Sequence, residues 1–269
     1  MDDRCHFSAG KSRLPASTRR ASSSSLVRVD RIVQGDSLSI LKTIPDESVD
    51  CCITSPPYNK GWWRQRSFGK RKADTWRGAG IDYGDFSDAL APDEYEAQQT
   101  AVIVELVRVL KPKGSIFYNH KALVYRHRLI YPTWVFRFNL RQQVIWDRGN
   151  TPQIQPIRWL PTTEYLFWIT KTATQPKFNG WLGGQKTEVW RIPPRPFKDH
   201  PAPFPEELAF NCILATTDCY DVVLDPYMGS GTTAVVAQKL GRHYLGIELN
   251  PDYIRIAERR LKQIEEAAV

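Results

Sequence analysis

The hydrophobic residues of this chain form short continuous runs that alternate with longer stretches of helical spacing. The runs predict strands at 27–33, 49–54, 115–118, 140–146, 165–170, 222–224 and 244–248. Apolar positions three and four residues apart predict helices at 37–44, 92–110, 121–135, 205–215, 232–240 and 252–266. Strands that alternate with helices indicate an α/β, Rossmann-like fold with a mostly parallel sheet and helices on both faces.

Three segments lack this periodicity. Residues 1–25 are rich in serine and arginine and poor in aliphatic side chains, which predicts a disordered tail. Residues 59–91 form a long loop, and residues 171–205 hold seven prolines and predict a small irregular insert. The 269 residues, 42% of them hydrophobic, therefore suit one domain at 26–269 that follows the tail.

The positive charge is concentrated rather than spread. The formal charge is +8, and residues 60–80 hold seven basic residues against one acidic residue. Tryptophan and phenylalanine interrupt the cations in this stretch, a composition that suits phosphate neutralisation and base stacking. The residues that we expect to contact nucleic acid are Lys60, Trp62, Trp63, Arg64, Arg66, Lys70, Arg71 and Lys72.

Several classes of protein are disfavoured by what the sequence lacks. No run of eighteen apolar residues is present, and the first 25 residues have no apolar core of a signal peptide. Cysteines and histidines show no metal-ligand spacing, so no metal site is expected. We therefore expect an intracellular protein, in the bacterial cytoplasm and nucleoid or in the nucleus of a eukaryote, and the concentrated positive charge suits a polyanionic partner.

A glycine-rich turn follows the strand predicted at 222–224. Gly229 and Gly231 allow close backbone approach to a ligand, and the next helix presents free N–H groups. A P-loop is disfavoured because no lysine follows the glycines. Gly229-x-Gly231-x-x-Ala234 fits the dinucleotide fingerprint, and Glu248 ends the next strand, where it could hold a ribose diol.

The position of this turn near the end of the chain constrains the sheet. Only one strand and one helix follow it, so the strand at 244–248 needs a neighbour from elsewhere. The N-terminal strand at 27–33 is the available candidate. Asp36, Asp225 and Glu248 would then end adjacent strands at one edge of a circularly permuted nucleoside-binding sheet.

A second motif, Thr54-Ser55-Pro56-Pro57-Tyr58, ends a strand predicted to be covered on both faces. Two prolines remove two N–H donors and stiffen the backbone, which leaves outward carbonyls. The Ser55 hydroxyl and the Pro56 carbonyl would accept hydrogen bonds beside the aromatic face of Tyr58. Such a ledge suits a planar ring that carries an NH2 group.

Together, T-S-P-P-Y-N at 54–59 and D-P-Y-M-G-S-G-T-T at 225–233 resemble the amino methyltransferases of DNA. The resemblance extends to G-D at 35–36, H-P-x-x-F-P at 200–205 and Y-L-G-I-E-L-N-P at 244–251. The catalytic motif precedes the cofactor motif, as in the permuted beta class, and the serine version resembles the cytosine-N4 enzymes. Tyr227 stands where phenylalanine is more usual, and the insert at 171–205 is short for a target-recognition region.

The resemblance implies S-adenosylmethionine as cofactor and double-stranded DNA as partner, with a cognate restriction endonuclease as a further partner. The catalytic residues that it implies are Ser55, Pro56, Pro57 and Tyr58. The cofactor-binding residues that it implies are Asp36, Asp225, Pro226, Tyr227, Gly229, Gly231, Thr232, Thr233 and Glu248. The helix after Pro205 would help to hold the amino-acid end of the cofactor.

The expected reaction is direct in-line methylation of a flipped cytosine at N4, without a covalent intermediate. Cys51 and Cys52 lie inside a strand and do not form the nucleophile of cytosine carbon-5 enzymes. An adenine-N6 enzyme and an RNA methyltransferase remain alternatives on the same scaffold. A nucleic-acid-binding module without activity and a nicotinamide oxidoreductase are less consistent with the motifs.

Overall fold

The computed structural model describes residues 27–59, 61–62, 88–149, 158–194 and 205–267. The tail predicted at 1–25 and most of the loop predicted at 59–91 lie outside these ranges, as do residues 195–204 of the insert.

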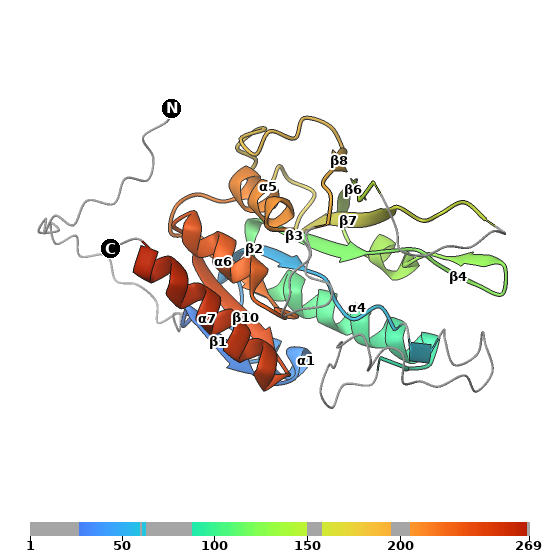
Figure 1. Cartoon of the computed structure of the whole chain (residues 1–269), viewed down its shortest axis with the longest axis horizontal. Coiled ribbons are helices and arrows are strands. Elements are labelled where there is room, and N and C mark those ends of the chain that lie inside the picture. Colours follow the sequence, from blue (N-terminus) through green and yellow to red (C-terminus); the bar gives the residue numbers. More distant parts are fainter. Residues whose placement is uncertain (1–26, 60, 63–87, 150–157, 195–204, 268–269) are drawn as a thin grey trace, which may run out of the picture.

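An eight-stranded sheet forms the centre of the molecule, in the order β1-β10-β9-β2-β3-β7-β6-β8 (Figure 1). The first five strands in this order are mutually parallel, whereas β7 runs antiparallel to both β3 and β6. The strands are β1 (Arg31–Gln34), β2 (Val49–Thr54), β3 (Leu110–His120), β6 (Leu140–Asp147), β7 (Thr163–Thr170), β8 (Val189–Arg191), β9 (Val222–Asp225) and β10 (His243–Glu248). The predicted α/β fold with a mostly parallel sheet is confirmed, and so is the pairing of the N-terminal strand with β10.

Helices cover both faces of this sheet. They are α1 (Ser37–Leu41), α4 (Pro92–Val109), α5 (Glu206–Thr216), α6 (Thr232–Lys239) and α7 (Pro251–Ala267). Figure 1 shows α4 and α5 on opposite sides of β2 and β3. Cys52 of β2 packs with α1 and α4, whereas Cys51 and Ile53 pack with α5 and α6. The continuous apolar run at 49–54 therefore reflects a strand that is buried on both faces.

Helix α4 passes into β3 without a connecting loop. The helix begins at Pro92 and ends at Val109, one residue before the predicted end, and Leu110 is already extended. The strand predicted at 115–118 therefore begins five residues early. Pro112 explains the extension, because a proline disfavours the helical conformation in the residue before it, here Lys111.

The helix predicted at 121–135 is wrong. The chain forms a two-stranded hairpin of β4 (Leu123–Tyr125) and β5 (Arg128–Ile130), followed by the short 3-10 helix η1 (Thr133–Arg137). Pro132 interrupts a helix of this length, and Arg126 and His127 have positive φ angles that make a tight turn.

The insert predicted at 171–205 is less irregular than expected. β8 lies within it and pairs in parallel with β6, and Trp190 of this strand is buried. The segment is also joined to the sheet through a hydrogen bond from the Lys177 amide to the Lys113 carbonyl.

Candidate active site

The two predicted motifs lie side by side at one edge of the sheet. β2 and β9 are parallel neighbours in which Cys52 pairs with Leu224. The carboxyl ends of parallel neighbours meet at the same edge, about 4.8 Å apart. The segment that follows Thr54 and the turn that follows Asp225 therefore border the same space, where open α/β sheets bind ligands.

Three acidic side chains follow adjacent strands at this edge, as predicted. Glu248 ends β10 and pairs with Gln34 of β1, two residues before Asp36. Asp225 ends β9 and pairs with Gly246 of β10. Asp36 is exposed and caps α1, where its Oδ1 accepts from the Ser39 amide at 2.9 Å. Ser37 Oγ donates to the Pro226 carbonyl at 2.5 Å and so joins α1 to the glycine-rich turn.

Asp225 is buried and held in one orientation. Its carboxylate accepts from Thr233 Oγ1 at 2.6 Å and from the Tyr227 amide at 3.1 Å. Burial raises the pKa of Asp225 from 3.8 to about 6, although both hydrogen bonds favour the ionised form. A buried carboxylate with a raised pKa at a ligand-binding edge is a candidate partner for a cationic group.

Glu248 and two glycines shape the turn itself. Glu248 Oε2 accepts from the Gly229 amide at 2.7 Å, and Oε1 accepts from the Asn250 amide at 2.8 Å. Burial raises the pKa of Glu248. Gly229 has a φ of 54° and Gly231 a φ of 82°, in the left-handed region that favours glycine. The turn thus has the left-handed glycines and the carboxylate that were predicted for it, but Gly231 is buried and Gly229 is only partly exposed.

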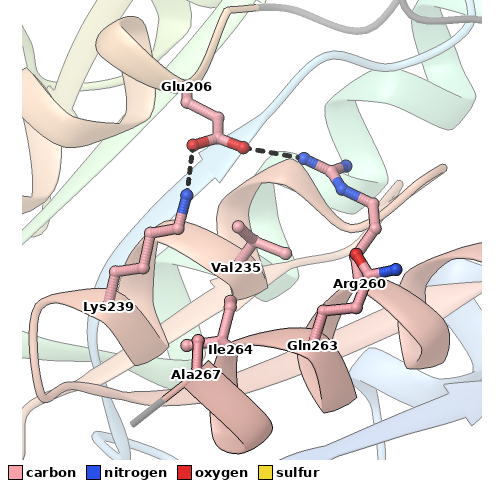
Figure 2. Close-up of a pocket in the computed structure, with 7 residues that line it drawn as sticks. All are labelled: Glu206, Val235, Lys239, Arg260, Gln263, Ile264 and Ala267. Carbon is pink, nitrogen blue, oxygen red and sulfur yellow. Dashed lines mark hydrogen bonds and ion pairs between the residues drawn. The ribbon is translucent and has the colours of Figure 1, made fainter.

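Arg260 of α7 supports the turn from behind. Its Nη1 donates to the Ser230 carbonyl at 2.7 Å, and its Nη2 pairs with Glu206 at 3.0 Å. Glu206 also pairs with Lys239 at 2.7 Å, so one carboxylate joins α5, α6 and α7 (Figure 2). A pocket of about 430 Å³ beside this cluster is lined by Glu206, Val235, Lys239, Arg260, Gln263, Ile264 and Ala267. None of the predicted cofactor-binding side chains lines it.

At the ledge, the Ser55 hydroxyl belongs to a network of side chains from three strands. Ser55 Oγ lies 2.8 Å from the Tyr58 hydroxyl, which donates to Glu164 Oε2 at 3.0 Å. Arg148 Nη1 pairs with the other oxygen of Glu164 at 2.9 Å. Because the single Tyr58 proton goes to the carboxylate, Ser55 must donate its own proton to Tyr58. The remaining lone pair of Ser55 Oγ is then an acceptor, as the motif predicted.

Asn119, at the end of β3, completes this network. Its Nδ2 lies 2.8 Å from the Tyr58 hydroxyl, 3.2 Å from Glu164 Oε2 and 3.3 Å from Ser55 Oγ. Its Oδ1 is buried and accepts no hydrogen bond from the described residues. Sequence analysis missed Asn119, Arg148 and Glu164. The available signal was a polar residue directly beside the apolar runs at 115–118 and 165–170, and two residues after the run at 140–146.

The prolines are placed differently from what the motif predicted. The Pro57 carbonyl does not face outward, because the buried Tyr95 hydroxyl donates to it at 2.6 Å. The same hydroxyl lies 2.9 Å from Nε2 of His120, which is buried as well. The Pro56 carbonyl accepts no hydrogen bond from a described residue. Of the two predicted outward carbonyls, only that of Pro56 is thus left for a ligand.

The Tyr58 ring is less accessible than the motif suggested. It is 8% exposed, its centroid lies 4.8 Å from the His120 ring, and Lys121 Nζ is 5.7 Å from that centroid. The hydroxyl end of Tyr58 therefore has a defined partner set, whereas its face is partly covered.

Of the residues predicted to contact nucleic acid, only Trp62 lies within the described ranges. Its ring centroid is 5.6 Å from that of Tyr125 in the β4–β5 hairpin. The other predicted contacts lie outside these ranges: Lys60, Trp63, Arg64, Arg66, Lys70, Arg71 and Lys72. The two ends of the loop predicted at 59–91 are joined, because Asn59 exchanges two hydrogen bonds of 2.8 Å with the Leu90 backbone.

The cysteines of β2 are buried thiols. Burial raises the pKa of Cys51 to about 12 and raises the pKa of Cys52 as well. A thiol with such a pKa is a poor nucleophile at neutral pH, in agreement with the sequence-based expectation.

Comparison with known proteins identifies the fold and the family. A family model described as DNA methylase (N6/N4 methyltransferase) matches residues 49–259. The type II methyltransferase M.Cfr9I of Citrobacter freundii is 33% identical, over 86% of this chain and 87% of its own length. The cytosine-N4-specific PvuII DNA methyltransferase has the same fold, with a TM-score of 0.66 at 22% identity, over 90% of this chain and 92% of its own.

A further solved structure is that of a Thermus thermophilus protein described as a DNA modification methylase, complexed with S-adenosyl-L-methionine. It is 25% identical with a TM-score of 0.62, and the match covers 87% of this chain and 93% of that one. The family match extends over most of the chain, including both motifs described above. This chain is therefore a member of the N6/N4 DNA methylase family.

Proposed function

We propose that this enzyme transfers a methyl group from S-adenosylmethionine to the N4 amine of a flipped cytosine in DNA. The observation that carries the proposal is the Ser55 hydroxyl, oriented as a hydrogen-bond acceptor beside the glycine-rich turn. The ledge would hold the amine for direct, in-line transfer, in which the N–CH3 bond forms as the S–CH3 bond breaks, and the methylated amine would then lose one proton to water. No covalent intermediate on the protein is needed, which agrees with the buried thiols of β2.

The residues at the sheet edge fit S-adenosylmethionine. This cofactor supplies a methyl group activated by a sulfonium cation. The turn from Asp225 to Gly231 would hold its methionine part, and the buried Asp225 carboxylate matches the positive charge. Glu248 would bind the ribose hydroxyls and Asp36 would lie near the adenine. The set is completed by Pro226, Tyr227, Thr232 and Thr233. Two of these are held by hydrogen bonds, since the Pro226 carbonyl accepts from Ser37 and the Thr233 hydroxyl donates to Asp225.

The ledge would prepare the amine for attack. An exocyclic amine is a weak nucleophile because its lone pair is conjugated with the ring. Hydrogen bonds from its two N–H groups to Ser55 Oγ and the Pro56 carbonyl would favour a tetrahedral nitrogen and release that pair. The Tyr58 face would stabilise the developing positive charge by about 0.5–2 kcal/mol once Lys121 has moved aside. The buried Asn119 Oδ1, which accepts no hydrogen bond from the described part of the chain, is a further acceptor at the same place.

The enzyme must take its base out of the duplex, at a cost of a few kcal/mol. We assign this task to the basic loop at 59–91, with Lys60, Trp62 and the cations up to Lys72 as DNA contacts. The insert at 171–205 would read the target sequence. The partner is double-stranded DNA inside the cell, and a cognate restriction endonuclease would accompany the enzyme. The order of the two motifs supports assignment to the permuted beta class.

Cytosine-N4 is preferred to adenine-N6 because Ser55 stands where adenine-N6 enzymes more often have aspartate or asparagine. The test is incubation of the purified protein with S-adenosylmethionine and plasmid DNA, followed by digestion and mass spectrometry of the nucleosides. N4-methyldeoxycytidine is expected. N6-methyldeoxyadenosine in its place would assign the adenine reaction, and methylation of matched RNA alone would remove DNA as the substrate.

A further inference from the structure

The β4–β5 hairpin projects from the sheet directly after β3, the strand that carries Asn119 and His120. Its register pairs Tyr125 with Arg128, so Arg126 and His127 form a two-residue turn at the tip. Figure 1 shows the hairpin extending beyond the end of β3, clear of the sheet. Arg126, His127 and Arg128 are exposed, and so is Leu129.

No described residue neutralises the cations at this tip. Arg126 and Arg128 form no ion pair with any described residue. Basic side chains elsewhere on the body do have acidic partners, for example Arg137 with Glu96 on α4. Arg126 instead lies over the Tyr125 ring, with its guanidinium carbon 5.3 Å from the ring centroid. The tip therefore presents positive charge outward with no internal counterion among the described residues.

The backbone at the tip is also unfavourable for these residues. Arg126 has a φ of 48° and His127 a φ of 63°. A turn with two consecutive positive φ angles favours Asn-Gly, because larger L-residues are strained there. Strain of this kind is commonly kept where the side chains serve a function. A different dipeptide, such as Asn-Gly, would therefore make the folded protein more stable.

The base of the hairpin lies at the rim of the candidate active site. His120 and Lys121 precede it, and both side chains lie against the Tyr58 ring. Tyr125 contacts Trp62, at the start of the basic segment 60–72. The hairpin is thus in contact with Trp62 of the basic segment, and the residues at its base contact the ledge.

We propose that the β4–β5 hairpin is a DNA-contacting arm, in which Arg126 and Arg128 bind phosphates beside the flipped base. This inference rests on the proposed function and adds a contact element outside both the basic loop and the insert. A two-stranded ribbon is narrow enough to lie along a DNA groove, and two guanidinium groups at its end match adjacent phosphates.

The test is the salt dependence of binding to a short DNA duplex by Arg126→Gln/Arg128→Gln in the full-length protein. The loss of two phosphate contacts is expected to weaken binding at least tenfold at low salt. It should reduce the slope of log K against log salt by about 1.8. The matched control is Arg255→Gln/Arg259→Gln, which removes two exposed arginines from α7, beside β1 (Figure 1). Its slope should stay close to that of the wild type.

A second variant, Arg126→Asn/His127→Gly, separates contact from folding. Asn-Gly suits the turn, so thermal stability should hold or rise while DNA affinity falls. A wild-type slope in both hairpin variants would overturn the inference, and so would an equal change in the α7 control. Nucleoside mass spectrometry on the wild type tests the proposed reaction separately. Failure of the methylation reaction is thereby distinguished from failure of the hairpin contact.

Discussion

The hydroxyl oxygens of Ser55 and Tyr58 lie 2.8 Å apart, three residues from each other on a turn stiffened by two prolines. The Tyr58 proton is committed to Glu164, and Arg148 holds that carboxylate from its other side. The direction of the Ser55–Tyr58 hydrogen bond is therefore set by Glu164 of β7 and by Arg148, which directly follows β6. A side-chain network from the antiparallel part of the sheet thus orients a group at the end of a parallel strand.

Ser55→Ala should slow methylation by about 100-fold, the scale seen when one preorganised hydrogen-bonding group is removed from an active site. S-adenosylmethionine affinity should change less than twofold, since the cofactor residues follow other strands. Single-turnover rates and calorimetric cofactor titrations measure the two quantities. Ser48→Ala is the matched control, because Ser48 Oγ donates to the Pro45 carbonyl at the opposite edge of the sheet. An equal loss of cofactor binding in Ser55→Ala would show a structural role.

Tyr58→Phe should lower the methylation rate by about tenfold, the value of one ordinary hydrogen bond. The ring remains, whereas Ser55 loses the acceptor that orients it. Combination with Glu164→Gln should add little, because both changes release the same Ser55 proton. Tyr131→Phe, which removes a hydroxyl bonded to Gln143, serves as the control. Additive losses in the double variant would mean that Glu164 acts on something other than the Tyr58–Ser55 pair.

The parallel half of the sheet could be predicted from the sequence because its strands are buried on both faces. The strand at 49–54 is found at its predicted bounds, and the neighbour of β10 follows from the need to cover its far side. Burial on both faces leaves a short continuous apolar run, which indicates a strand when turn residues flank it, as prolines do here. The two motifs at the ends of these strands could therefore be placed together from the sequence alone.

The hairpin and the side-chain network could not be predicted in the same way. At 121–135, exposed strands leave no continuous apolar run, and the turn uses Arg126 and His127 where glycine or asparagine would have indicated it. Asn119 and Glu164 reach Ser55 through strand pairing across more than forty residues. Contacts of that range depend on register, which periodicity does not specify.

Binding of S-adenosylmethionine should weaken as the pH falls through about 6. In the free protein the pKa of Asp225 is about 6 because of burial, so the carboxyl takes up a proton below that pH. A cationic ligand favours the ionised form, so binding should release a proton and affinity should rise with pH through this range. Calorimetry in buffers of different ionisation enthalpy measures the protons released.

Asp225→Asn provides the control for this linkage. The amide keeps the shape and does not titrate, so the variant should bind weakly with a flatter pH profile. Glu248, whose pKa burial also raises, would account for what dependence is left. A wild-type profile in Asp225→Asn would assign the proton to another group.

Gly231→Ala should destabilise the protein by about 2–4 kcal/mol. An added Cβ would lie 2.7 Å from Ala257 Cβ, so α6 and α7 would have to separate, at about 1–3 kcal/mol for overpacking. The φ of 82° adds about 1 kcal/mol of left-handed strain. Urea unfolding followed by circular dichroism measures the sum.

Two further variants separate the overpacking part of this destabilisation from the backbone-strain part. Gly180→Ala has a comparable φ of 74° with nothing within 4 Å of the added Cβ, so it should show the strain alone. Gly231→Ala/Ala257→Gly removes the 2.7 Å contact and leaves one of 3.2 Å with the Cα of residue 257, at the cost of about 1 kcal/mol for a glycine inside α7. The double variant should therefore be less impaired than the sum of its single changes. If the two changes simply add, the α6–α7 contact does not limit the turn, and the need for glycine at 231 lies in its backbone conformation.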